Sequence, residues 1–374
     1  MNNTMTHAPA SAARRAFTLA ELIVVISIIV LLLAIAVPAF RNLLYSSERS
    51  LAENQMRAGI TAARDAAIQS ESGDAAAYFS FTPGGRLRII PVVQVGTITD
   101  IQTSSNGSQP GGIEADRDVF VPLGTSEPVQ LPRWWSVRGY TPPLTTENRE
   151  AGGRHGWYEN LRLRGDQGNW VFPETGFIDP ADGEAGWTQQ SFIIRFTGGT
   201  GELDASNRNL AIVLDVSATD EFRNAAPWSI PALRADIATN QARFARRVLA
   251  ERQDLTPPNR LRILGDRSLD TVLVRPVSEL GLYDERRLAA GLGATSLNRV
   301  TGTLYANDTT DPTRAALIPT LDTGLFTGVN EEEIADMINR WIEGRLTMNG
   351  ELVESESRVF GLQNYLGQMQ EVEP

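Results

Sequence analysis

The chain has 374 residues and a formal net charge of −11, so it can hold an anchor and one or two globular units, and a general affinity for nucleic acid is not expected. It contains no cysteine, which excludes disulfides, thiol nucleophiles and cysteine-ligated zinc. Its basic residues are all arginine, which excludes Schiff-base chemistry and a phosphate-binding lysine, and the two histidines, His7 and His155, leave few common catalytic arrangements.

The N-terminal part carries the clearest pattern of the sequence. Residues 1–16 are mostly small and polar and include the basic residues Arg14 and Arg15. Leu22 to Phe40 has no charged side chain, and about 20 apolar residues are enough for a helix to cross a bilayer. The two arginines before this segment predict an N-terminus in the cytoplasm. Glu21 lies at the head of the segment, where a carboxylate is costly and by default has a functional partner.

The stretch Ala16-Phe17-Thr18-Leu19-Ala20-Glu21 resembles the type IV prepilin signature. Prepilin peptidase cuts that family after a small residue, usually glycine, and before phenylalanine, whose new amine is then N-methylated. The resemblance implies cleavage between Ala16 and Phe17, methylation of Phe17, and an acidic residue of the family at Glu21. A proline that the family places further along falls on Pro38, where we expect a kink or local melting of the helix. Alanine at the cleavage position and a long leader depart from the usual pattern.

The acidic residue suggests a mode of assembly. Cleavage would give Phe17 a positive amine at the head of an apolar helix. We expect this amine to lie against Glu21 of a neighbouring subunit, because each charge would be expensive alone in an apolar filament core. Such a pair would fix the axial register of the helices, since sliding them would leave both charges unpaired.

The helix is predicted to continue past the membrane to about Ser70. Apolar residues recur there at helical spacing, at Leu43, Leu44, Leu51, Met56, Ile60, Ala63 and Ala67. The resemblance implies a pilin-like α+β fold, in which an antiparallel sheet packs on the long N-terminal helix, here with an enlarged C-terminal α+β region. We therefore divide the chain into a leader (1–16), an N-terminal helix (17–72, with 17–40 in the membrane), a β-rich pilin-like domain (73–226) and a C-terminal extension of mixed helix and strand (227–374).

Strands are predicted after the helix breakers at 71–74. Tyr78 to Phe81 and Leu87 to Val95 flank the turn Pro83-Gly84-Gly85, and shorter strands are expected at 119–123 and 134–137. Phe192 to Phe196 alternates apolar and polar residues, turns through 198–201 and returns as Leu210 to Val216. This pattern predicts the clearest β-hairpin of the chain.

The C-terminal region mixes both kinds of element. A helix is expected to open at Pro231, strands at 261–264 and 271–274, and a short helical stretch from Val277 to Gly291, broken at Gly281. Asn330 is predicted to cap a helix that begins with three glutamates, which suit a helix N-terminus. The buried face of that helix is expected to comprise Ile334, Met337, Ile338, Trp341 and Ile342.

Some groups have the residue types of a binding site but also a plainer interpretation. Two acidic turns could offer oxygen ligands to calcium, but neither has the spacing of an EF-hand loop; they comprise Asp179, Asp182 and Glu184, and Asn307, Asp308 and Asp311. Four arginines could contact DNA or an acidic partner, although a solvated helix face is the plainer interpretation; they are Arg243, Arg246, Arg247 and Arg252.

Two further patterns are weaker. Gly291 to Ala294 has some likeness to a dinucleotide loop but lacks the preceding strand and following helix. Trp134-Trp135 and Trp157-Tyr158 could form a sugar-binding surface, whereas core packing is the commoner use of such residues. We predict no catalytic residue, metal or cofactor.

The sequence thus predicts a minor pilin or pseudopilin of a type IV pilus or type II secretion-like filament, not an enzyme. The resemblance implies a single-pass protein of the inner membrane with its C-terminal domain in the periplasm, which joins a pilus or pseudopilus after assembly. It also implies prepilin peptidase, other pilin or pseudopilin subunits and an inner-membrane assembly platform as partners. Two alternatives stay open: an uncleaved, membrane-anchored ligand-binding protein outside the cytoplasm, and an anchored hydrolase that uses an Asp/Glu pair.

Overall fold

The computed structural model describes part of the chain, divided between two compact units, Met1–Ser50 and Leu51–Pro374. The described residues are 19–70, 73–82, 86–102, 113–124, 126–141, 169–171, 175–178, 187–204, 211–214, 271–299, 301–307, 319–364 and 368–372. The boundary between the units falls inside the first helix.

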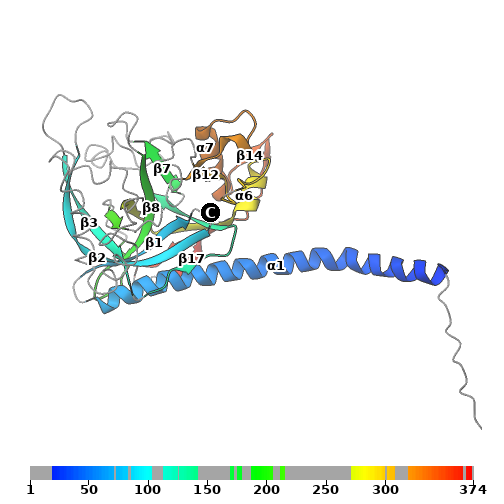
Figure 1. Ribbon diagram of the computed structural model, residues 1–374, viewed down its shortest axis with the longest axis horizontal. Coiled ribbons are helices and arrows are strands. Elements are labelled where there is room, and N and C mark those ends of the chain that lie inside the picture. The colour runs from blue at the N-terminus through cyan, green and yellow to red at the C-terminus, as the bar shows by residue number, and fades with distance from the viewer. Residues whose placement is uncertain are drawn as a thin grey trace, which may run out of the picture. The chain divides into compact units, whose positions relative to one another are not determined.

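That helix, α1, is a single element of 51 residues, Leu19–Gln69 (Figure 1). At a rise of 1.5 Å per residue it is about 77 Å long, which is far more than a bilayer requires. The predicted continuation of the helix to about Ser70 is confirmed. Helical structure is assigned without interruption through Pro38.

Six strands of the second unit close into a barrel. Around the ring these are β1 (Ala75–Thr82), β2 (Arg86–Gln102), β3 (Ile113–Pro122), β9 (Ala211–Leu214), β10 (Thr271–Pro276) and β8 (Trp187–Phe196), which pairs back with β1. The pairs β3–β9 and β8–β10 are parallel, and the other four are antiparallel. The short strands β4 (Val129–Gln130) and β7 (Thr175–Ile178) add to β2 and β8.

The α+β class with a long N-terminal helix is confirmed, but the expected pilin-like antiparallel sheet is wrong, because the observed sheet is mixed and closed. One face of its strands forms a single apolar cluster, as in a small barrel filled by side chains. The cluster comprises Ala76, Tyr78, Ile90, Val92, Phe120, Ile193, Ala211, Val213, Val272 and Val274.

The hairpin predicted between residues 192 and 216 is also wrong. Both strands exist, but β10 lies between them, parallel to β8 and antiparallel to β9. The turn does form, since the Thr197 N–H donates to the Glu202 carbonyl at 2.8 Å and Phe196 bridges to Leu203. All four residues of β9 are buried, and such a strand takes neighbours on both edges, here β3 and β10.

A second, antiparallel sheet has the order β17 (Met369–Val372), β16 (Arg358–Leu362), β11 (Glu279–Asp284), β5 (Trp135–Thr141) and β6 (Asn169–Val171). The helical stretch predicted from Val277 is therefore wrong in its first half, where β11 pairs with β16 and β5. Its second half is helical, as α6 (Glu285–Gly291). Gly281 allows close packing in β11, since a Cβ there would lie 3.1 Å from Ile342 and 3.2 Å from Trp170.

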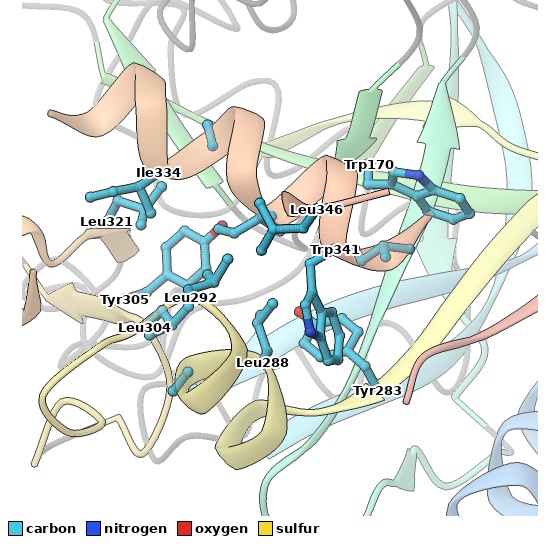
Figure 2. Packing of buried hydrophobic residues seen from close by; sticks show 14 of the residues in the cluster. Trp170, Tyr283, Leu288, Leu292, Leu304, Tyr305, Leu321, Ile334, Trp341 and Leu346 are labelled. Carbon is cyan, nitrogen blue, oxygen red and sulfur yellow. The ribbon is translucent and has the colours of Figure 1, made fainter. Parts of the chain in front are cut away.

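The remaining elements form a cap around one apolar cluster (Figure 2). They are α6, the hairpin of β12 (Tyr305–Asn307) and β13 (Pro319–Leu321), η4 (Thr323–Leu325), α7 (Glu331–Ile342), and the hairpin of β14 (Thr347–Met348) and β15 (Glu351–Leu352). The predicted cap of α7 is confirmed: Asn330 and Glu333 form a capping box. Its expected apolar face is buried at Ile334, Ile338, Trp341 and Ile342, with Met337 partly buried.

Candidate functional site

The first part of α1 is apolar on every side. Consecutive residues from Leu22 to Ile26 are each about half exposed, as are Leu31 to Leu33. An amphipathic helix would instead expose one polar face. Among the described residues, α1 is the one helix long and apolar enough to cross a membrane. This segment therefore needs an apolar environment, which lipid or other helices can provide.

The residues of the N-terminal signature are described only in part. Glu21 lies in the first turn of α1, with an exposed side chain, directly before the apolar segment. A negative charge is favoured there by the partial positive charge of the helix N-terminus. Pro38 lies inside α1. The predicted cleavage and methylation positions, Ala16 and Phe17, and the basic residues Arg14 and Arg15 lie outside the described residues.

From Leu51 onward, α1 belongs to the second unit and docks on it through one face of small and apolar residues. Its buried positions are Ala52, Met56, Gly59, Ile60, Ala63 and Ala67, which follow helical spacing. A Cβ at Gly59 would come within 2.7 Å of Ile89 Cγ2, so the helix backbone lies directly on β2. The sequence had predicted four of these positions; Leu51, which it placed on the same face, is 49% exposed.

Polar contacts hold the two ends of the docked segment. Near Leu51, Glu53 forms an ion pair with Arg358 of β16, and Arg57 Nη1 donates to the Met369 carbonyl of β17 at 3.1 Å. At the other end, Arg64 Nε donates to the Gly201 carbonyl at 3.2 Å, and the Gly199 N–H donates to the Ala67 carbonyl at 2.9 Å. Different parts of the chain therefore hold the two ends.

A second charged group lies on the barrel, around Arg195 of β8. The guanidinium is 2.6 Å from carboxylate oxygens of Asp74 and Asp118 and 3.5 Å from Asp204. It also lies 5.4 Å from the centre of the Phe120 ring. The three carboxylates gather around a cation of the protein itself, and among the described residues no acidic or histidine group is arranged to hold a metal ion.

A third group is fully buried between the second sheet and the cap. Arg138 of β5 donates from Nε to Tyr283 Oη at 2.9 Å and from Nη2 to Tyr305 Oη at 2.7 Å. The Tyr283 hydroxyl donates to Glu285 Oε1 at 3.2 Å. The Oε2 atom of Glu285 has no hydrogen-bond partner among the described residues. Figure 2 shows the two tyrosine rings of this group within the apolar cluster.

Burial dominates the electrostatics of this group. It raises the pKa of the Glu285 carboxyl to about 7, because the buried carboxylate loses its hydration, while the positive charge of Arg138 and hydrogen bonds from Tyr283, Ser136 and the Leu304 backbone act in the opposite direction. The charge of Glu285 therefore changes close to neutral pH.

The tryptophan pair is not an open sugar-binding surface. Trp135 is buried, whereas Trp134 is half-buried and has the guanidinium groups of Arg133 and Arg286 at 4.8 and 4.6 Å from its ring. The Trp134 backbone has a φ of 68°, and its carbonyl accepts the Glu285 N–H at 2.8 Å. Trp134 is thus occupied by contacts within the protein.

The remaining sequence motifs lie partly inside and partly outside the described residues. Gly291 is the last residue of α6, and residues 292–294 form the turn after it, with a φ of +71° at Gly293; they do not form a dinucleotide loop. Backbone structure is described for Asn307, in β12, but not its side chain. The remaining candidates lie outside the described residues: Asp179, Asp182, Glu184, Asp308, Asp311, Arg243, Arg246, Arg247, Arg252, Trp157 and Tyr158.

Comparison with protein-family models, with curated proteins and with solved structures gives no match. The candidate site lies on α1, which has an apolar segment headed by Glu21, followed by a segment docked on the globular unit. The sequence missed Gly59, Glu53 and Arg57 as docking residues. A glycine among alanines signalled a close approach at Gly59, but no local pattern connects Glu53 with Arg358.

Proposed function

We propose that the chain is a type IV pilin-like subunit, of the minor pilin or pseudopilin kind, in a type IV pilus or type II secretion-like filament. The observation that supports this most is the division of α1. Its first part is apolar on all sides and begins with Glu21, while its second part is docked on a globular unit. An anchor that only held a protein in the membrane would have no use for a carboxylate at the head of its apolar segment.

The proposed mechanism uses the same helix in two environments. In the inner membrane, lipid surrounds the exposed apolar side chains. After prepilin peptidase cuts between Ala16 and Phe17, the subunit moves from the assembly platform into a filament, where neighbouring helices replace the lipid. The N-methylated amine of Phe17 then pairs with Glu21 of a neighbour, so that two charges are not left alone in an apolar core.

The globular unit has a different role in this proposal. It stays on the periplasmic or outer side and presents the barrel and the cap for contacts with partners. Its closed, mixed barrel is not the sheet that the pilin resemblance implies, so support for the proposal comes from α1 and the N-terminal sequence.

Replacing Glu21 by alanine tests the role in assembly. We expect Glu21→Ala to stay in the membrane fraction and to be lost from sheared filaments, whereas Glu48→Ala, further along α1, should assemble normally. Normal recovery of Glu21→Ala in filaments would contradict the proposed charge pair.

The alternative of an uncleaved, membrane-anchored binding protein is favoured by one observation, the departure of the barrel from the expected sheet. It predicts an intact N-terminus and no filament fraction for the unmodified chain.

A further inference from the structure

The last two strands of the chain meet the beginning of the docked segment of α1. Arg358 of β16 is paired on one side with Glu53 of α1 and on the other with Glu371 of β17. Its guanidinium lies 5.4 Å from the centre of the buried Phe360 ring. The side chain is 26% exposed and that of Glu53 is 16% exposed, so water screens this pair less than a surface ion pair.

A second contact satisfies the open edge of β17. In the described part of the second sheet, β17 pairs with β16 alone. The Gln363 N–H donates to the Gln368 carbonyl, and the Leu362 N–H donates to Ser278 on the other side of β16. Leu362 and Met369 are therefore a non-hydrogen-bonded pair, and the Met369 carbonyl points away from β16. Arg57 supplies the hydrogen bond that this edge carbonyl would otherwise lack.

Both arginines also face the same ring. The Arg57 guanidinium lies 5.9 Å from the centre of Phe360, on the strand that carries Arg358. Two cations on one aromatic ring repel each other, and this arrangement is balanced here by Glu53 and Glu371. This end of α1 therefore makes polar and charged contacts with the sheet, beside the buried positions Ala52 and Met56.

The other end of the docked segment has different partners. Gly59 lies on Ile89 of β2, and Arg64 and Ala67 bond to the 199–201 turn. The partners in these contacts are Ile89 of the barrel strand β2 and the 199–201 turn after β8, all of which lie far before β16 in the sequence. The contacts of Glu53 and Arg57 require residues 358–372 at the end of the chain.

We propose that the hairpin β16–β17 acts as a strap that holds α1 from Glu53 to Arg57, and that this end of the helix can be released while the rest of the segment stays docked. Docking of the α1 turns from Glu53 to Arg57 therefore depends on β16 and β17. Because these turns come directly after Ser50 in the chain, tension along α1 acts on the strap first. This inference stands on the contacts themselves and does not require prepilin cleavage.

Hydrogen exchange of the full chain in detergent, read by mass spectrometry, tests the strap. We expect Arg358→Met to speed exchange of the amides at 53–58 by about tenfold, which corresponds to about 1.4 kcal/mol. The amides at 63–68 should keep their rates, because their contacts lie on the barrel. Arg340→Met is the matched control: it removes an arginine whose partner, Asp336, lies on the same helix, and should change neither set.

Two other variants keep the test decisive if Arg358→Met folds poorly. Glu53→Gln should speed exchange at 53–58 in the same way. The double variant Glu53→Gln/Arg57→Met should exceed either single change, since it removes both the ion pair of Glu53 and the hydrogen bond of Arg57 to the strap. Unchanged rates at 53–58 in Glu53→Gln, or equal acceleration along the whole segment 51–69, would overturn the proposal.

Discussion

Gly59 of α1 and Ile89 of β2 are so close that a Cβ on the glycine would come within 2.7 Å of the isoleucine Cγ2. This approach decides how the docked segment of α1 lies on the barrel. The buried positions beside it are Met56, Ile60 and Ala63, so the helix contacts the globular unit through its backbone at Gly59 and through apolar side chains on either side.

A large side chain at Gly59 should push the helix off the barrel. We expect Gly59→Leu to lower the free energy of unfolding of the globular unit by about 2–3 kcal/mol, because its side chain has no space against Ile89. Gly59→Ala should lower the free energy of unfolding by less. Alanine is about 1 kcal/mol more favourable than glycine inside a helix, and this gain partly offsets the clash of its Cβ with Ile89.

Denaturant unfolding, followed by tryptophan fluorescence, measures both variants. Ala58→Leu is the control, because this neighbouring residue is exposed on the same helix, and it should stay within about 0.5 kcal/mol of the unmodified protein. An equal effect of Ala58→Leu and Gly59→Leu would show that close packing on β2 is not the cause.

Glu285 should make stability depend on pH near neutrality. Its pKa is raised from 4.5 to about 7 in the folded protein, mainly by burial. The folded state therefore binds this proton more tightly than the unfolded state, and its contribution to stability is fully present below pH 4.5 and is lost as the pH rises through 7. The full change is about 3 kcal/mol at 1.36 kcal/mol per pKa unit.

The variant Glu285→Gln removes this titration. The difference in free energy of unfolding between the variant and the unmodified protein should therefore shift in favour of the variant as the pH is raised from 5 to 8. Urea unfolding at several pH values measures this difference. Glu279→Gln, on the exposed start of β11, should leave the pH dependence unchanged. If Glu285→Gln keeps the pH dependence of the unmodified protein, another group is responsible.

Arg195 should stabilise the barrel by holding three carboxylates together. Arg195→Met leaves Asp74, Asp118 and Asp204 without their shared cation, and we expect a loss of about 3 kcal/mol at pH 7. Thermal unfolding at pH 7 measures this, with Arg287→Met, which removes a half-exposed partner of Glu356, as the control. An equal loss in Arg195→Met and Arg287→Met would argue against a special role of this buried cation.

Local sequence signals predicted the local structure well. The length of α1 followed from an unbroken apolar and amphipathic pattern, and the start of α7 followed from Asn330 and the glutamates after it. Both depend on residues within one or two helical turns, which a sequence displays directly.

Pairing between distant segments was not accessible in the same way. The turn after Phe196 predicted a hairpin, but β10, from far along the chain, lies between β8 and β9 and buries Val272 and Val274. After the exposed Glu279, β11 is buried on both faces from Leu280 to Asp284 and therefore lacks the alternation that marks a strand. Likewise, the group of Arg138 and Glu285 and the pair of Glu53 and Arg358 join residues that no local pattern relates.

The mass of the N-terminal peptide of the protein recovered from membranes tests the central claim most directly. The proposed function predicts a peptide that starts at Phe17 and carries one extra methyl group. A peptide that still starts at Met1, from cells that process other prepilins, would contradict it and would favour the uncleaved, anchored binding protein.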